Sequence, residues 1–286
     1  MSSGYTKRRK IISRVAEILC ASAVVVALVP LAMILFYVVK EGFGALNLAF
    51  FTQMPKPVGE TGGGMANAIV GTLILIGIAA LLAVPIGCIC GIHLSEYPGR
   101  RFSSVVRFAA DVLNGVPSIV IGIFAYGLAV LPFKRFNAIA GGVALGIMMI
   151  PIVVRTTEEL LRLVPGGLRE GALALGATRS RAVFSVLVPA ALPGILTGVL
   201  VALARIAGET APLLFTAFNN RFWSTSLTQP IASLTVQVFT YAISPYDDWH
   251  RQAWAGALLL VAMILVLSIA ARTAVRRLER MGRGGA

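Results

Sequence analysis

Two oppositely charged residues, Arg205 and Glu209, lie within a stretch of otherwise apolar and small residues at 190–218. If this stretch is a helix that begins near Ala190, Arg205 lies about 15 residues along it, or roughly 22 Å at 1.5 Å per residue. In a membrane that is near or beyond the middle of the bilayer, where a charged side chain costs about 2.5–3.5 kcal/mol and usually faces a partner or a water-filled path. Glu209 follows at i+4 on the same helical face, so we expect it to neutralise the guanidinium. The alternative is a buried ion pair that only holds helices together.

Gly208 and Pro212 lie four residues apart in the same stretch. The proline removes the helical hydrogen bond to the carbonyl of Gly208, and such a Gly–Pro pair is typical of a bent helix. The pair predicts a kink or hinge in the helix that carries Arg205 and Glu209.

A second stretch, 170–189, is polar and rich in arginine, although intensely apolar stretches flank it. Leu168, Ala172 and Leu175 recur at helical spacing, and Gly176 can take the left-handed conformation that ends a helix. We therefore expect a short amphipathic helix, a sharp turn and a second short helix. Glu170 suits a helix N-terminus or a basic partner. Three small residues would let the first helix lie close in a partner's groove: Gly171, Ala172 and Ala174. The stretch predicts a docking surface rather than an ordinary solvated loop.

Membrane helices must position both stretches. Hydrophobic residues make up 57% of the chain and charged residues only 13%, so a soluble monomer would expose too much apolar surface to water. A spanning helix needs about 20 mostly apolar residues. The sequence predicts an all-α polytopic membrane protein with six transmembrane helices. They are placed near 15–39, 66–92, 116–134, 137–157, 190–218 and 253–274.

The net charge of +13 is distributed in a way that argues against a nucleic-acid partner. Lys and Arg concentrate before the first span, between the second and third, between the fourth and fifth, and after the sixth. Such residues accumulate on the cytoplasmic side of a bilayer. The sequence predicts that both termini and the 158–189 loop are cytoplasmic. It also favours an uncleaved first helix over a signal peptide, because the apolar run is long and more spans follow.

The chain divides into three regions. Residues 1–64 contain an N-terminal cytoplasmic tail, the first transmembrane helix and an external linker rich in Pro and Gly. Residues 65–272 form the main membrane domain, and residues 273–286 form a basic cytoplasmic tail. Neither the three cysteines, which lack C-x-x-C spacing, nor the two distant histidines predict a metal site.

Charged residues also occur at the ends of the third and fourth spans. Asp111 and Asn114 precede Pro117 at the cytoplasmic end of the third span, where they could line an inner gate or cap that helix. We favour capping, because Asp and Asn are common at such positions. Four charged residues at i+3 and i+4 spacing continue the fourth span, and a solvated face of ion pairs explains them: Arg155, Glu158, Glu159 and Arg162.

Both chemical stretches resemble one family of transporters. The string E-G-A, three residues, Gly176, nine residues and V-x-V-P ending at Pro189 resembles the cytoplasmic E-A-A-x3-G-x9-I-x-L-P loop of permease subunits of ATP-binding-cassette (ABC) importers. It departs from that pattern at Gly171, Val186 and Val188, each of similar size to the usual residue. The string R-x-x-G-E-T-A-P-L-L-x-T-A, which begins at Arg205, resembles the PstA-type permeases of the phosphate-specific ABC importer. The segments 96–100 and 115–127 share this resemblance, which covers nearly the whole chain, while His93 departs from the expected apolar or aromatic residue.

The resemblance implies a type I ABC importer permease fold and a subunit that translocates inorganic phosphate across the cytoplasmic (inner) membrane. Its implied partners are a homologous second permease subunit in a heterodimer, a cytoplasmic ATPase dimer and an extracytoplasmic phosphate-binding protein. The sequence holds no G-x-x-x-x-G-K-[ST] string, so the chain is expected to be no enzyme and to bind no cofactor, with ATP and Mg held by the partner ATPase.

The resemblance also implies roles for individual residues. Arg205, Glu209 and Thr210 would lie on the substrate path, with Gly208 and Pro212 as a hinge. A planar guanidinium suits the oxygens of a phosphate bidentately, and Glu209 would keep Arg205 in place and prevent overly tight binding. The ATPase-coupling loop would consist of Glu170, Gly171, Ala172, Gly176 and Pro189.

Three other functions fit parts of the pattern. A permease for another oxyanion, such as sulfate or molybdate, should keep the docking loop but lack the G-E-T-A-P string. A secondary transporter would need no such loop and would carry titratable pairs in several spans, whereas only Arg205 and Glu209 are expected to lie deep. A scaffold role beside an active partner permease is a third reading.

Overall fold

The computed structural model describes residues 3–60 and 62–283, and within these ranges the regular structure is helical. Five long helices dominate: α1 (Ser3–Phe43), α3 (Ala66–Glu96), α7 (Ala138–Leu163), α10 (Val188–Ala207) and α13 (Asp247–Arg283). Shorter helices connect them: α2 (Leu48–Thr52), α4 (Arg101–Gly115), α5 (Ser118–Ala125), α6 (Leu131–Phe133), α8 (Gly166–Ala174), α9 (Arg179–Ala182), α11 (Ala211–Thr216) and α12 (Leu234–Ala242). Two π-helical turns, η1 (Tyr126–Val130) and η2 (Val183–Leu187), join α5 to α6 and α9 to α10.

Five helical segments of the described chain are long and apolar enough to cross a membrane, and a sixth span is possible if one bent pair counts as one. The pair consists of 101–115 and 118–133, which meet at 107°. The third span predicted at 116–134 corresponds to the second helix of this pair, whereas the preceding helix over 101–115 was not predicted. Pro117 disfavours a helical conformation in the residue before it, and Val116 is indeed extended, with ψ of 130°.

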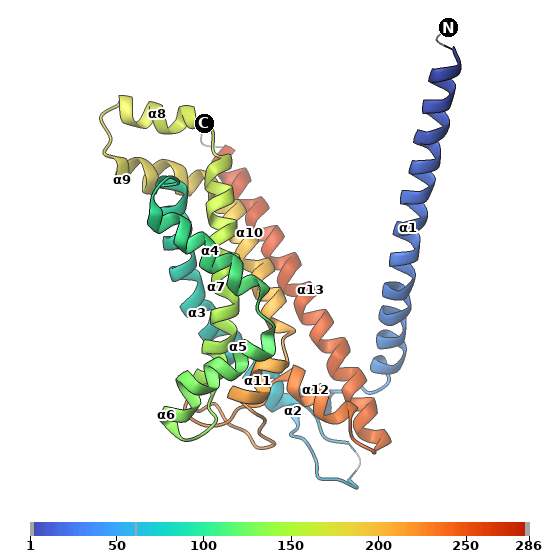
Figure 1. Ribbon diagram of the computed structural model, residues 1–286. Coiled ribbons are helices and arrows are strands. Elements are labelled where there is room, and N and C mark those ends of the chain that lie inside the picture. Colours follow the sequence, from blue (N-terminus) through green and yellow to red (C-terminus); the bar gives the residue numbers. More distant parts are fainter. Residues whose placement is uncertain (1–2, 61, 284–286) are drawn as a thin grey trace.

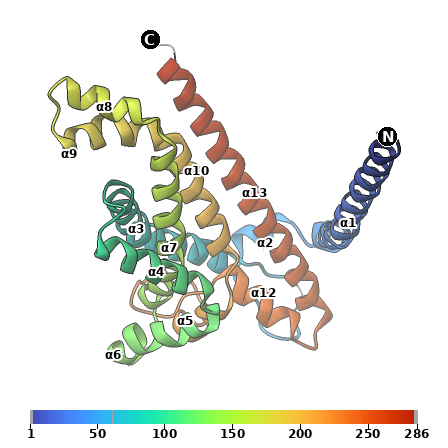
Figure 2. The same ribbon diagram turned by 45° about the horizontal axis from the view of Figure 1, so that its top comes forward.

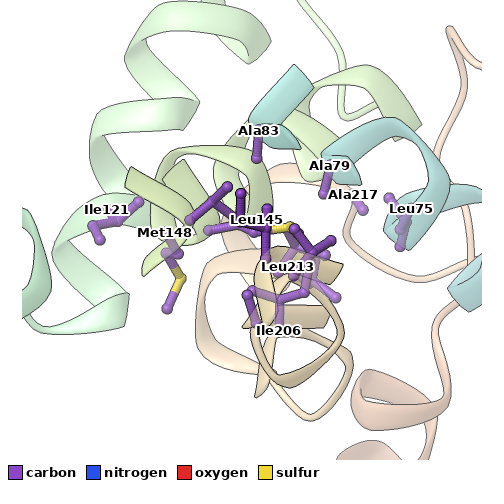
Figure 3. Close-up of a cluster of buried hydrophobic side chains, with 14 of the residues drawn as sticks. Leu75, Ala79, Ala83, Ile121, Leu145, Met148, Ile206, Leu213 and Ala217 are labelled. Carbon is purple, nitrogen blue, oxygen red and sulfur yellow. The ribbon is translucent and has the colours of Figure 1, made fainter. Parts of the chain in front are cut away.

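The core forms where α3 lies along α7, and α5, α10 and α11 pack around them. Figure 3 shows apolar side chains converging there, including Leu75 of α3, Leu145 of α7 and Ile206 of α10. Glycines set the close approach of α3 and α7: a Cβ added at Gly87 would lie 2.6 Å from that of Val153. Small residues at contacts are what membrane helices need to pack without a hydrophobic driving force.

Helix α1 stands apart from the bundle and meets it only beside the first part of α13 (Figure 1). Its described side chains are exposed along most of its length. The contact includes the rings of Tyr37 and Trp254, 5.9 Å apart, and Gly42 against the backbone of Trp254. The bundle itself thus does not depend on most of α1.

Gly71 and Gly77 provide a matched test of packing within α3. A Cβ at Gly71 would lie 2.0 Å from the carbonyl oxygen of Ala232, whereas one at Gly77 would meet nothing within 4 Å. We expect Gly71→Ala to lower the thermal unfolding midpoint in detergent by several degrees, because backbone must move to admit the methyl group. Gly77→Ala should leave it equal or higher, since alanine favours a helix by about 1 kcal/mol over glycine. Equal midpoints for both variants would contradict this packing.

Candidate functional site

The stretch expected to dock a partner forms a hairpin of α8 and α9, here called the coupling hairpin (residues 166–182), that projects from one end of the bundle (Figure 2). Gly176 follows the end of α8 with φ of +78°, as the sequence predicts. The amide of Gly176 donates to the carbonyl of Leu173 at 2.9 Å, and that of Ala177 donates to the carbonyl of Ala172 at 3.1 Å. This pair of bonds satisfies the last carbonyls of α8 and reverses the chain.

The outer face of the coupling hairpin is open. Glu170 and Gly171 are exposed, and nothing lies within 4 Å of a Cβ added at Gly171. Leu175 is 91% exposed, and Leu168 and Leu173 are also uncovered. An apolar, small-residue face on a projecting element is typical of a protein interface.

The second half of the predicted loop differs from the expectation in one respect. From Arg179 the chain runs as one continuous helix through η2 and α10 to Ala207, so the second short helix is the start of the fifth span. Pro189 lies exposed in the first turn of α10. A continuous helix therefore connects the hairpin to α10.

Gly176 supports a prediction about the hairpin turn. An L-residue in the left-handed region costs about 1–2 kcal/mol, so we expect Gly176→Ala to speed amide exchange at the end of α8 about 5- to 30-fold. Hydrogen–deuterium exchange of a peptide covering 172–177 measures this. Gly167→Ala is the control, since Gly167 lies within α8 with open space around it. Equal exchange in both variants would show that the turn does not need glycine.

The second candidate site, around Arg205, lies where α10 ends. The sequence predicted one helix over 190–218, but α10 ends at Ala207 and α11 begins at Ala211. The ring of Pro212 would clash with the carbonyl of Gly208 in a continuous helix, and proline is tolerated in the first turn of a new one. The expected kink at Gly208 and Pro212 is thus a complete break.

This break separates Arg205 from Glu209. Arg205 is exposed in the last turn of α10, while Glu209 lies beyond the helix and is half-buried. No hydrogen bond or ion pair joins their side chains in the part of the chain that the structure describes. The predicted i+4 pairing is therefore wrong for this conformation, since it required a helix through both residues. Because the helix starts at Arg179, Arg205 lies about 39 Å along it rather than 22 Å.

Neighbouring elements hold the α10–α11 break in place. The hydroxyl of Thr235, in the first turn of α12, donates to the carbonyl of Glu209 at 2.9 Å. Pro212 is buried against α5, where a Cβ at Gly122 would lie 2.7 Å from the Cα of Pro212. Thr210 occupies the N-cap position of α11 without a side-chain capping bond. Among the described residues, neither the hydroxyl of Thr210 nor the guanidinium of Arg205 has a side-chain hydrogen bond or ion pair.

A buried charge cluster joins α4 to α7, and the sequence analysis missed it. Glu158 is only 1% exposed and accepts from Arg107 at 2.6 Å, Arg155 at 3.3 Å and Arg162 at 2.6 Å. The solvated face predicted for these residues is wrong for Glu158. Asp111 does not cap a helix but accepts from Arg155 at 2.7 Å. Arg107 and Asp111 are i+4 neighbours on α4, and the charge on that otherwise apolar segment is the signal that could have indicated a partner.

A second buried carboxylate, Glu96 at the end of α3, lies against the coupling hairpin. It pairs with Arg169 of α8 and with Arg179 of α9. The sequence analysis noted the 96–100 segment only as part of a resemblance. An isolated Glu at the end of an apolar helix, with arginines in a predicted docking loop, is the signal that could have indicated this contact.

Comparisons with known proteins agree with this architecture. The family described as "Binding-protein-dependent transport system inner membrane component" matches residues 83–281. The "Phosphate transport system permease protein PstA" of Yersinia pestis is 47% identical over 262 residues, covering 91% of this chain and 88% of that protein. The protein of the same name from Haemophilus influenzae is 46% identical, covering 87% and 89%.

A solved structure supports the fold. A chain of a bacterial alginate ABC transporter, determined in complex with an alginate-bound periplasmic protein, superposes with a TM-score of 0.66. The match covers 94% of this chain and 96% of that one at 14% sequence identity. Such low identity shows a shared fold, that of type I ABC importer permeases, and nothing about substrate.

Proposed function

Because this chain belongs to the family of binding-protein-dependent transport system inner membrane components, and among them to the PstA-type permeases, we propose that it carries inorganic phosphate across the cytoplasmic membrane. The observation that carries the proposal is the 47% identity to a phosphate transport permease over 91% of this chain. The G-E-T-A-P string at 208–212 and the projecting coupling hairpin are the two features that such a subunit needs on this chain.

The energy for transport would come from a partner. We propose that a cytoplasmic ATPase dimer, which holds ATP and Mg, docks on the exposed face of the coupling hairpin at Glu170, Gly171 and Ala172. Gly176 would allow the turn between α8 and α9, and Pro189 would mark the first turn of α10. Docking is supported by the open, small-residue surface at Gly171 and by the exposure of Leu175.

Two further partners complete the proposed assembly. A homologous permease subunit would pair with this chain as a heterodimer, so that phosphate crosses between the two. A phosphate-binding protein would deliver the anion at the face opposite the coupling hairpin. The exposed apolar surfaces of α4 and α5 leave room for such pairing within the bilayer.

We propose that both termini and the coupling hairpin face the cytoplasm. The start of α1, the end of α13 and the coupling hairpin lie at the same end of the molecule in Figure 1. The same three regions carry most of the Lys and Arg residues, as the positive-inside rule requires for the cytoplasmic side. Residues 1–64, 65–272 and 273–286 then form the N-terminal tail with its peripheral helix and linker, the permease domain and a basic cytoplasmic tail.

The substrate path is proposed to pass Arg205, Glu209 and Thr210. Arg205 is exposed and makes no ion pair with Glu209, so its guanidinium can donate two hydrogen bonds to the oxygens of a phosphate. Glu209, four residues further on, can compete for the same guanidinium and so promote release. Gly208 and Pro212, at the α10–α11 break, would act as the hinge that brings these groups together and apart.

Uptake of radiolabelled phosphate tests the proposed function. The chain is reconstituted in vesicles with its candidate permease partner, ATPase and binding protein. Uptake is measured with and without ATP on the side of the membrane that holds the ATPase. We expect ATP-dependent uptake that a tenfold excess of sulfate or molybdate does not inhibit. Inhibition by either oxyanion, or uptake without ATP, would instead favour another oxyanion permease or a secondary transporter.

A further inference from the structure

The carboxylate of Glu96 is the most enclosed charged group at the coupling hairpin. Its side chain is 6% exposed, whereas those of its partners Arg169 and Arg179 are 36% and 53% exposed. Arg179 Nε donates to Glu96 Oε2 at 3.2 Å, and Arg169 donates to Glu96 Oε1. A buried carboxylate needs such partners, because an unpaired charge in this position would be strongly unfavourable.

The backbone and the neighbouring ring extend this contact. Arg179 also donates to the main-chain carbonyl of Glu96, at the last turn of α3. The guanidinium carbons of Arg179 and Arg100 lie 4.5 and 4.4 Å from the centre of the Tyr97 ring. Guanidinium groups at this distance attract the face of an aromatic ring. Arg179 is therefore fixed by a carboxylate, a carbonyl and a ring, all at the end of α3.

The contact uses the inner face of the coupling hairpin. Arg169 and Arg179 point to Glu96 from α8 and α9, one from each side of the turn at Gly176. Glu170 and Leu175 remain exposed on the other face. The hairpin can consequently engage a partner without releasing Glu96.

Helix α3 is not joined to the hairpin by the chain itself. The hairpin follows α7 and continues into α10, and helices α4 to α7 separate it from α3 in the chain, with 73 and 83 residues separating Glu96 from Arg169 and Arg179. Just before Glu96 in the chain, α3 packs closely on α7, where Gly91 lies against Thr157. A rigid attachment at Glu96 would make α3 move with the hairpin, together with α7 and α10.

We propose that Glu96 is a positioning residue for energy coupling: it fixes the coupling hairpin to α3, so that a displacement of the hairpin by the ATPase moves α3 as well. This inference rests on the proposed function, in which the hairpin receives the motion of an ATPase. It assigns a role to a residue outside both the coupling loop and the substrate path. Without Glu96, ATP hydrolysis continues but less of it is converted into transport.

The number of phosphates transported per ATP hydrolysed, measured in vesicles holding the full assembly, tests this role. We expect Glu96→Gln to lower that ratio about tenfold. This is the change that corresponds to losing hydrogen bonds to a charged group that contribute roughly 1.4 kcal/mol or more. The matched control is Glu159→Gln, which removes an exposed carboxylate from the cytoplasmic end of α7. The control should keep the wild-type ratio.

Three additional variants separate positioning from general stability. Arg169→Gln with Arg179→Gln should give the same defect as Glu96→Gln, and the triple variant no further loss, because all three remove one attachment. Glu96→Asp keeps the charge and should restore part of the ratio. Hydrogen–deuterium exchange of residues 169–182 should be faster in Glu96→Gln than in the control.

An unchanged ratio in assembled Glu96→Gln would overturn the proposal, and so would additive defects in the triple variant. If Glu96→Gln does not assemble, the single variant Arg169→Gln carries the same test, since Arg179 still pairs with the buried Glu96. Absence of ATP-dependent phosphate uptake by the wild-type assembly would instead contradict the proposed function, so the two failures are distinguishable.

Discussion

Replacing Arg205 by glutamine is expected to lower ATP-dependent phosphate uptake about ten- to a hundredfold while ATP hydrolysis by the assembly continues. Hydrogen bonds to a charged group contribute about 1.5–3 kcal/mol, and glutamine keeps a polar side chain but loses the charge and the planar fork. Arg205 is exposed at the end of α10 and pairs with no carboxylate among the described residues, so its removal leaves no buried charge unpaired. The effect should therefore appear in transport and not in folding.

Arg251→Gln is the matched control for this experiment. Arg251 is also exposed and lies near the start of α13, at the same end of the molecule as the α10–α11 break. It should transport phosphate at the wild-type rate. If Arg205→Gln assembles, hydrolyses ATP and takes up phosphate normally, Arg205 does not lie on the substrate path.

Replacing Glu158 by glutamine is expected to have the largest effect on stability. Three arginines converge on this carboxylate from two helices, and it is 1% exposed. Removing one partner of a buried ion pair destabilises a protein by about 3–5 kcal/mol, because the opposite charges remain. We expect a thermal unfolding midpoint in detergent that is lower by ten degrees or more, since about 1 kcal/mol corresponds to several degrees in a small domain and roughly half that in a larger one.

Glu159→Gln again provides the control, this time for stability. It removes the neighbouring carboxylate, which is exposed and has no ion-pair partner within the described chain. Surface substitutions of this kind change stability by less than about 0.5 kcal/mol. Similar midpoints for the two variants would show that the three arginines are stabilised by water rather than by Glu158.

Local features of this chain were predictable because their causes are local. Long apolar runs require a bilayer whatever their partners, so the helical membrane fold and most of its spans follow from composition. The turn after α8 depends on a few residues around Gly176, and its left-handed backbone was expected from glycine and spacing alone. The family strings at 170–189 and 205–217 likewise lie in continuous sequence, and identity to known permeases confirmed the family that they indicate.

Features that depend on distant segments were not predictable in the same way. The end of α10 is set by Gly208 and Pro212 together with packing of Pro212 on α5 and the bond from Thr235, and this separated Arg205 from Glu209. Spacing at i+4 describes neighbours only while the helix continues. A sequence pattern could not decide between a kink and a break, because elements elsewhere in the chain determine which is lower in free energy.

The two buried carboxylates show the same limit most clearly. In the sequence, Glu158 is one member of a charged helix face and Glu96 ends an apolar helix. Only the structure places α4 beside Glu158 and the coupling hairpin beside Glu96. Each buried carboxylate pairs with at least one arginine that is distant in the chain: 51 residues away for Glu158, and 73 and 83 residues away for Glu96. The sequence by itself determined a helical membrane permease with a polar hairpin between two spans. Only the tertiary structure decided which charges hold that hairpin to the bundle, because ion pairing across such separations is fixed by helix packing.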